Sequence, residues 1–128
     1  SETANENLRR AGVSDDRIFF VGNTMIDTLL QQMPHFTAPV CWDELGLGRS
    51  GYFVVTLHRP ANVDDPAALR ALLEAIAAGA GGVPVVFPVH PRTANRMQAL
   101  SGGLPSLHYV PPQPYREFNY LVQHAKAV

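Results

Sequence analysis

The chain has 128 residues, of which 46% are hydrophobic and 16% are charged. This composition allows the buried core of one ordinary domain and excludes a disordered chain. The net charge is −1 and there is no basic run, so binding to nucleic acid or to a membrane surface through bulk charge has no support. No apolar run reaches the roughly 18 residues of a membrane span, and no signal peptide is visible.

The single cysteine and the two chain ends carry further information. Cys41 has no partner for an internal disulfide, which predicts a reducing, cytoplasmic compartment and a packing role for this residue. The chain begins at Ser1, inside what reads as a helix, and ends where a helix gives way to small and apolar residues. We therefore expect an excised piece of a larger protein.

The first fifty residues predict short elements. Residues 3–11 read as a polar helix with Gly12 at its C-cap, and the apolar run at 17–21 reads as a buried strand. Asn23 or Thr24 is expected to cap a helix that continues to about Gln32. The prolines and glycines of 34–51 predict a linker, although its Trp and Leu side chains suggest that it packs against something.

From residue 51 onwards the pattern alternates regularly between strands and helices. Strands are predicted at 52–57, 83–89 and 107–110, and helices at 65–78, 92–100 and 115–123. Because the strands are nearly continuous apolar runs, they are expected to pair in parallel within an α/β layer. In such sheets ligands bind beyond the carboxyl ends of the strands.

The first strand is followed by His58 and Arg59. Arginine offers a fork of donors to phosphate oxygens, histidine can donate a hydrogen bond or move a proton, and the next helix could add its N-terminal amides. The alternative is an ordinary loop, in which Asn62 or Asp64 caps the helix and His58 is a satisfied surface residue.

Two later strand ends are also candidates. His90 follows the second strand, and this position favours a functional role for its side chain. Arg92 and Thr93 are instead expected to cap the next helix. Gln113 follows the third strand with the donors and acceptor needed to read a base edge, and Phe118 could stack on a ring. The alternative for Phe118 is a core contact. His35, His108 and His124 lack metal-ligand spacing, so no metal site is predicted.

These segments, in this order, resemble the non-hydrolysing UDP-N-acetylglucosamine 2-epimerase family. So does Gly22-Asn23-Thr24-Met25-Ile26-Asp27, which is similar to the family's Gly-Asn-Thr-x-Ile-Asp segment near the crossing between its two domains. The resemblance covers nearly the whole chain, from Asn5 to the helix that contains Phe118. Each motif alone is modest, whereas four in order at the expected spacing are specific.

The resemblance implies a Rossmann-like parallel sheet within a two-domain fold similar to B-type glycosyltransferases. Residues 1–22 would end the N-terminal domain, 23–50 would form the crossover helix and linker, and 51–128 would be the first half of the C-terminal nucleotide-sugar-binding domain. The family's Thr-Asp-Ser-Gly-Gly loop and its candidate acid and base carboxylates have no counterpart in this chain. We therefore expect the chain on its own to be inactive.

The implied activity is an isomerase reaction of bacterial cell-surface polysaccharide biosynthesis, the interconversion of UDP-N-acetylglucosamine and UDP-N-acetylmannosamine. It proceeds by elimination and re-addition of UDP without NAD or a metal. On the matching positions, His58 would contact the phosphates and aid departure of UDP. Gln113 and Phe118 would hold the uracil end, and the full-length protein would be a cytoplasmic homodimer.

Arg59 and His90 match positions that bind a second UDP-N-acetylglucosamine as an activator in some bacterial members. Many members read His-Arg-x-Glu-Asn, but position 61 here is alanine, which favours a non-allosteric enzyme. Three alternatives stay open: an epimerase of another UDP-sugar, a B-type glycosyltransferase, and a nucleotide-binding module without chemistry. The parallel pairing further predicts that His58, His90 and Gln113 lie at one edge of the sheet.

Overall fold

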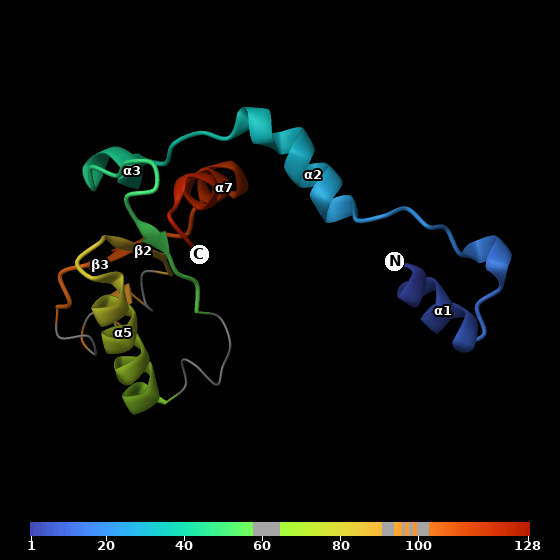
Figure 1. Ribbon diagram of the computed structural model, residues 1–128, viewed down its shortest axis with the longest axis horizontal. Coiled ribbons are helices and arrows are strands. Elements are labelled where there is room, and N and C mark those ends of the chain that lie inside the picture. Colours follow the sequence, from blue (N-terminus) through green and yellow to red (C-terminus); the bar gives the residue numbers. More distant parts are fainter. Residues whose placement is uncertain (58–64, 91–93, 96, 98, 100–102) are drawn as a thin grey trace. The chain divides into compact units, whose positions relative to one another are not determined.

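The computed structural model describes residues 1–57, 65–90, 94, 95, 97, 99 and 103–128. The chain divides into two compact units, Ser1–His35 and Phe36–Val128. Figure 1 shows their helices and strands. None of the helices in the described part of the chain is long and apolar enough to cross a bilayer.

The first unit consists of short helices. Helix α1 (Glu2–Arg10) is followed by the 3-10 turn η1 (Asp15–Arg17), and an ion pair of 2.6 Å between Arg9 Nε and Asp15 Oδ1 joins the two. Helix α2 (Thr24–Gln32) leads into the turn η2 (Met33–His35). Asn23 caps α2, because its Oδ1 accepts from the Met25 N–H at 3.0 Å. Both helices predicted for this region are thus confirmed.

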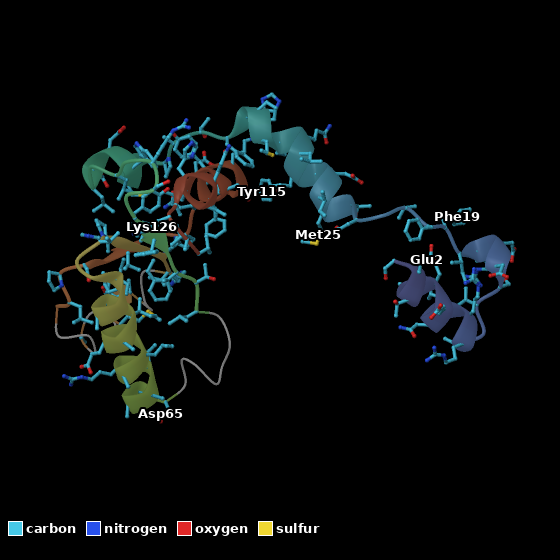
Figure 2. The ribbon with its side chains drawn as sticks, viewed as in Figure 1. Glu2, Phe19, Met25, Asp65, Tyr115 and Lys126 are labelled. Atoms are coloured by element: carbon cyan, nitrogen blue, oxygen red, sulfur yellow. The ribbon has the colours of Figure 1, made fainter. Side chains whose placement is uncertain are left out.

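The strand predicted at 17–21 is wrong. Arg17 ends the turn η1, and Ile18–Val21 has no strand assignment. The Phe19 side chain is 76% exposed and stands out from the backbone (Figure 2). A strand needs a neighbour for its backbone hydrogen bonds, and the described residues pair no strand with this segment. An apolar run alone does not supply that neighbour.

The second unit contains a parallel sheet in the order β1-β2-β3, formed by Phe53–Val54, Val85–Pro88 and Leu107–Val110. The register aligns Phe53 with Val85 and Val85 with Leu107. Helix α5 (Pro66–Ala80) connects β1 to β2, and α7 (Tyr115–His124) follows β3. Ala94, Asn95, Met97 and Ala99, between β2 and β3, are also helical. The predicted parallel pairing is confirmed, although β1 is shorter than expected.

Alternation along the strands divides the core between the two faces of the sheet. Phe53, Val85 and Leu107 belong to the cluster that contains Leu69 and Leu73 of α5. The alternate residues Val54 and Val86 belong to a second cluster, which also contains Cys41, Leu47 and Leu121 of α7. Since both faces are covered, the strands are apolar at nearly every position.

The segment expected to be a linker is folded onto this second face. It contains the short helix α3 (Val40–Glu44), whose Cys41 is buried. The Trp42 ring makes edge contacts with Tyr52, Tyr120 and His124, at centroid distances of 5.6, 5.1 and 5.8 Å. Trp42, whose presence suggested that this segment packs against something, therefore links α3 to Tyr52 just before β1 and to α7.

Residues Ser50 and Tyr52, just before β1, donate hydrogen bonds to carbonyls at the end of α7. The last carbonyls of a helix have no partner inside it. Here Tyr52 Oη donates to Leu121 O at 2.6 Å, and the Ser50 N–H donates to His124 O at 2.7 Å. Burial raises the pKa of the Tyr52 phenol well above its usual range, so the hydroxyl keeps the proton that it donates.

Candidate functional site

The carboxyl ends of β2 and β3 lie at one edge of the sheet, because the two strands are parallel. His90 comes two residues after β2, and Gln113 comes three residues after β3. The Val89 N–H donates to Val110 O at 2.9 Å, so the pairing continues up to these residues. This part of the prediction of a shared edge is confirmed. His58 and Arg59 lie outside the described residues.

The Gln113 side chain is turned towards its own loop. Its Nε2 donates to the Pro111 carbonyl at 2.7 Å, which leaves Oε1 as the atom that can accept a hydrogen bond from a ligand. Pro111, Pro112 and Pro114 restrict the backbone around it. The loop thus holds an acceptor in a fixed place beyond β3.

A pocket of about 480 Å³ lies between the start of α3 and the loop that follows β3. It is lined by Ala38, Pro39, Val40, Cys41, Glu44, Pro111, Gln113, Pro114 and Glu117. The walls are largely aliphatic, and the polar side chains are one amide and two carboxylates. Such a pocket favours a ligand that presents N–H groups to acceptors and a flat face to apolar walls.

The sequence pointed to Gln113 but not to Glu44 or Glu117. Glu117 lies in the first turn of α7, four residues after Gln113, so helical spacing could have indicated it. Glu44 had no comparable signal, because its helix was expected to be a linker. Burial raises the pKa of the Cys41 thiol, which keeps this pocket residue protonated and apolar at neutral pH.

Phe118 is partly buried and packs against the cluster that contains Cys41, Val54 and Leu121. The core role that the sequence left open is therefore confirmed. A stacking role towards a ligand ring stays a prediction. Its position is fixed because the Phe118 N–H closes the first turn of α7 by donating to Pro114 O at 2.8 Å.

The helices that follow β1 and β3 begin differently. Asp65 caps α5, since its Oδ1 accepts from the Ala67 N–H at 2.9 Å. The alternative of a cap by Asn62 or Asp64 is therefore wrong. No side chain of the described residues caps α7, whose preceding residue is Pro114.

The remaining histidines do not form a metal centre in the described part of the chain, where no group of three or more His, Cys, Asp or Glu side chains could hold an ion. His124 is 7% exposed, and its Nδ1 lies 2.8 Å from Tyr120 O. Its ring lies 4.2 Å from the ring of Tyr120. These contacts make His124 a residue of the core.

The family model for UDP-N-acetylglucosamine 2-epimerase matches residues 1–128. The UDP-N-acetylglucosamine 2-epimerase of Methanocaldococcus jannaschii is 31% identical over the whole chain, which covers 38% of that protein. The UDP-2,3-diacetamido-2,3-dideoxy-D-glucuronate 2-epimerase of Pseudomonas aeruginosa is 33% identical over the whole chain, which covers 36% of it. The chain thus spans a little over a third of the length of these curated relatives.

Solved structures agree with the sequence comparison. A structure of the M. jannaschii enzyme superposes with a TM-score of 0.78 at 29% identity, over 98% of this chain and 38% of that one. A second structure of the same enzyme, in complex with UDP-GlcNAc and UDP, gives a TM-score of 0.71 over 98% of this chain and 37% of that one. The parallel sheet and its helices are therefore shared with these proteins.

Proposed function

Since the chain belongs to the UDP-N-acetylglucosamine 2-epimerase family, we propose that it carries part of the nucleotide-sugar site of such an isomerase. The observation that supports this most directly is the position of His90 and Gln113 at the carboxyl edge of one parallel sheet. The substrate is UDP-N-acetylglucosamine, which is converted to UDP-N-acetylmannosamine. The M. jannaschii relative, with which this chain superposes, has been solved in complex with UDP-GlcNAc and UDP.

The proposed division of the chain follows the family's two-domain fold. Residues 1–22 end the N-terminal domain, 23–50 form the crossover, and 51–128 begin the nucleotide-sugar-binding domain. The parallel sheet within the last of these ranges supports its assignment as a Rossmann-like layer. The remaining catalytic groups would come from segments that this chain does not contain.

The roles of the site residues follow from their chemistry. His58 stabilises the departing diphosphate, because a donor aimed at developing charge acts most strongly in the transition state. Arg59 and His90 bind the phosphate and sugar region. Gln113 offers Oε1 to the N–H of the uracil ring, while its Nε2 remains bound to Pro111 O. Phe118 borders the base.

The same resemblance leads us to propose that the full-length protein is a cytoplasmic homodimer that requires neither NAD nor a metal. It would act in the synthesis of cell-surface polysaccharide. The mass of the full-length protein, measured by light scattering during size-exclusion chromatography, tests the dimer.

A second candidate is an epimerase of a different UDP-sugar. The P. aeruginosa relative, which is named for a diacetamido-dideoxyglucuronate, is 33% identical to this chain. This identity is as high as that of the relative named for UDP-N-acetylglucosamine. Comparing kcat/KM of the full-length protein on the two sugars decides between them, since the preferred substrate has the larger value.

The binding part of the proposal can be tested on the 128-residue chain itself. UDP should bind, and Gln113→Ala should weaken binding about fivefold, because one hydrogen bond to the base is worth about 1 kcal/mol. Gln123→Ala is the matched control, since Gln123 is an exposed glutamine of α7. Isothermal titration calorimetry with UDP measures both. Equal affinities for the two variants would remove Gln113 from the site.

A further inference from the structure

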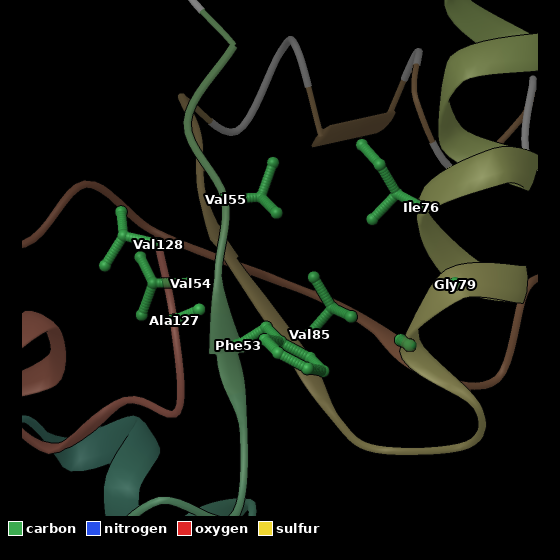
Figure 3. Close-up of a pocket in the computed structure, with 9 residues that line it drawn as sticks. Phe53, Val54, Val55, Ile76, Gly79, Val85, Ala127 and Val128 are labelled. Atoms are coloured by element: carbon green, nitrogen blue, oxygen red, sulfur yellow. The ribbon is translucent and has the colours of Figure 1, made fainter.

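Two pockets of the second unit differ in charge. The pocket of about 240 Å³ beside β1 is lined by apolar residues and glycine, among them Phe53, Ile76 and Gly79 (Figure 3). The pocket of about 480 Å³ between α3 and the loop after β3 carries two carboxylates, Glu44 and Glu117. None of the nine described residues that line it is Lys, Arg or His. Only this second pocket can therefore act on the charge of a ligand.

The charge of the two carboxylates is not compensated locally. In the described part of the chain, neither Glu44 nor Glu117 takes part in an ion pair. Their field reaches the inner wall, where Cys41 is 6% exposed and lines the pocket. The pKa of the Cys41 thiol is raised by burial and, to a smaller extent, by the charge of Glu44. The inside of the pocket is thus at a negative potential.

The polar side chains of this pocket present acceptors to a ligand. Gln113 Nε2 donates to Pro111 O at 2.7 Å, which leaves Oε1, and both carboxylates accept hydrogen bonds. Uracil is uncharged at neutral pH and carries an N–H, so it fits these acceptors. A diphosphate is negative and carries acceptor oxygens, so it finds no donor among these side chains and is repelled by the carboxylates.

The position of Glu44 points to a role outside its own helix. Glu117 lies in the first turn of α7, where a carboxylate stabilises a helix. Glu44 is instead the last residue of α3, where a negative charge opposes the helix dipole. The carboxylate of Glu44 therefore does not serve the stability of α3, whereas it does add to the negative potential of the pocket.

We propose that Glu44 and Glu117 are specificity-determining residues that exclude phosphate groups from this pocket and so fix the direction in which a nucleotide binds. The base lies inside, and the diphosphate lies outside in solvent of higher dielectric constant. The carboxylates do not attract the base, but they make the reversed orientation unfavourable. This inference rests on the proposed function, in which Gln113 binds the uracil ring.

The test compares the binding of UDP and of uridine to the wild-type chain and to the double variant Glu44→Gln, Glu117→Gln. Glutamine keeps the size of the side chain and removes its charge. We expect the affinity for UDP to rise about two- to fivefold at low salt, because the diphosphate lies within reach of both charges. The affinity for uridine, which has no phosphate, should not change. Isothermal titration calorimetry measures both ligands.

Salt and NMR give two further measurements. In about 0.5 M salt the gain for UDP should disappear, because the screening length falls to roughly 4 Å. In wild type, the uracil H5 and H6 protons of bound UDP should show NOEs to the methyl groups of Val40, which lines the pocket. These NOEs should weaken in the double variant, as the reversed orientation becomes populated.

Asp43→Asn is the matched control. Asp43 is an exposed carboxylate of the same helix, next to Glu44, and it is not among the residues that line the pocket. The substitution removes one negative charge, as each Glu→Gln change does, so it separates the potential inside the pocket from the net charge of the chain. The affinity of Asp43→Asn for UDP should equal that of wild type, and thermal melts verify that each variant is folded.

Several outcomes would overturn the inference. Equal affinities of the double variant and Asp43→Asn for UDP would show that the carboxylates do not act on the diphosphate. Weaker binding of uridine to the double variant would show that they bind the base instead. Absence of the NOEs to Val40 in wild type would place the base elsewhere. The first outcome leaves the proposed function intact if Gln113→Ala still weakens UDP binding, whereas failure of wild type to bind UDP would overturn both.

Discussion

Tyr52 connects burial, hydrogen bonding and ionisation in a single side chain. It is fully buried and donates to Leu121 O at 2.6 Å, and burial raises the pKa of its phenol. Burial likewise raises the pKa of the Cys41 thiol. Both groups are neutral when protonated, so the folded protein retains these protons to higher pH than the unfolded chain does.

The stability that these two groups contribute is complete below their unfolded pKa values and is lost as the pH rises above them. The unfolded values are about 8.5 for cysteine and about 10 for tyrosine. We therefore expect Tm to fall from about pH 8.5 and more steeply above about pH 10. Tyr52→Phe should lower the free energy of unfolding by about 1 kcal/mol at pH 7, because it removes the hydrogen bond to Leu121 O. The variant should also show a less steep fall of Tm above about pH 10.

Thermal melts from pH 7 to pH 11 measure both effects of Tyr52→Phe. Tyr115→Phe is the control, because Tyr115 is an exposed tyrosine of α7 and its loss should leave the alkaline slope unchanged. Parallel curves for wild type and Tyr52→Phe above pH 10 would show that Tyr52 does not couple ionisation to unfolding.

His58→Ala, in a protein of the relatives' full length, tests the proposed catalytic residue. A donor to the departing diphosphate acts mainly on the transition state, so its loss should lower kcat more than it raises KM. We expect kcat to fall by roughly 10²–10³-fold, as for removal of one preorganised donor to a developing anion. Arg59→Ala should have a smaller effect if alanine at position 61 reports a non-allosteric enzyme.

A melting curve on the same His58→Ala preparation separates chemistry from folding. A structural histidine would lower Tm while the folded fraction kept its normal turnover. His35→Ala provides a control with an exposed histidine outside the sheet. Near-wild-type kcat for His58→Ala would remove this residue from the mechanism.

At the scale of elements, α5 depends on a single side chain for its start. Asp65 Oδ1 accepts from the Ala67 N–H, and Pro66 occupies the first turn. We expect Asp65→Ala to lower the free energy of unfolding by about 1 kcal/mol, whereas Asp65→Asn should keep most of the cap. For a unit of this size the alanine variant should lower Tm by about 4–8 °C.

Glu74→Ala is the control for this prediction, because Glu74 forms an exposed ion pair with Arg70 on the same helix, at 2.9 Å. Such pairs are worth a few tenths of a kcal/mol, so Tm should change little. If Asp65→Ala and Glu74→Ala melted at the same temperature, the Asp65 cap would contribute no more to stability than the exposed ion pair does.

The helices were predicted well, because what specifies them lies within their own sequence. Asn23 precedes the first turn of α2, and Pro66 opens the periodic stripe of α5. The strand expected at 17–21 failed for the opposite reason, since pairing requires a neighbour that local sequence cannot supply. Helix α3 was missed because five residues among prolines and glycines give no periodic signal.

At the scale of the whole molecule, the 128-residue chain should show no epimerase activity. Elimination and re-addition of UDP require groups from both domains in one geometry, and misplacement alone can cost on the order of a hundredfold. The chain spans 38% of the M. jannaschii relative, and the family resemblance implies that the candidate acid and base carboxylates lie outside the matched segments. Chromatography of UDP-N-acetylglucosamine incubated with the pure chain checks this, and measurable conversion would contradict it.

The sequence by itself determined the parallel α/β pattern, the positions of the main helices and the order of the strand ends that precede His90 and Gln113. These features depend on local periodicity, caps and turn residues, which each segment carries within itself. Only the tertiary structure decided that Gln113 turns its Nε2 to Pro111 O, that α3 contributes Glu44 to the pocket, and that Tyr52 completes the end of α7. These features join residues that are distant along the chain or depend on loop geometry, and only packing brings such groups together.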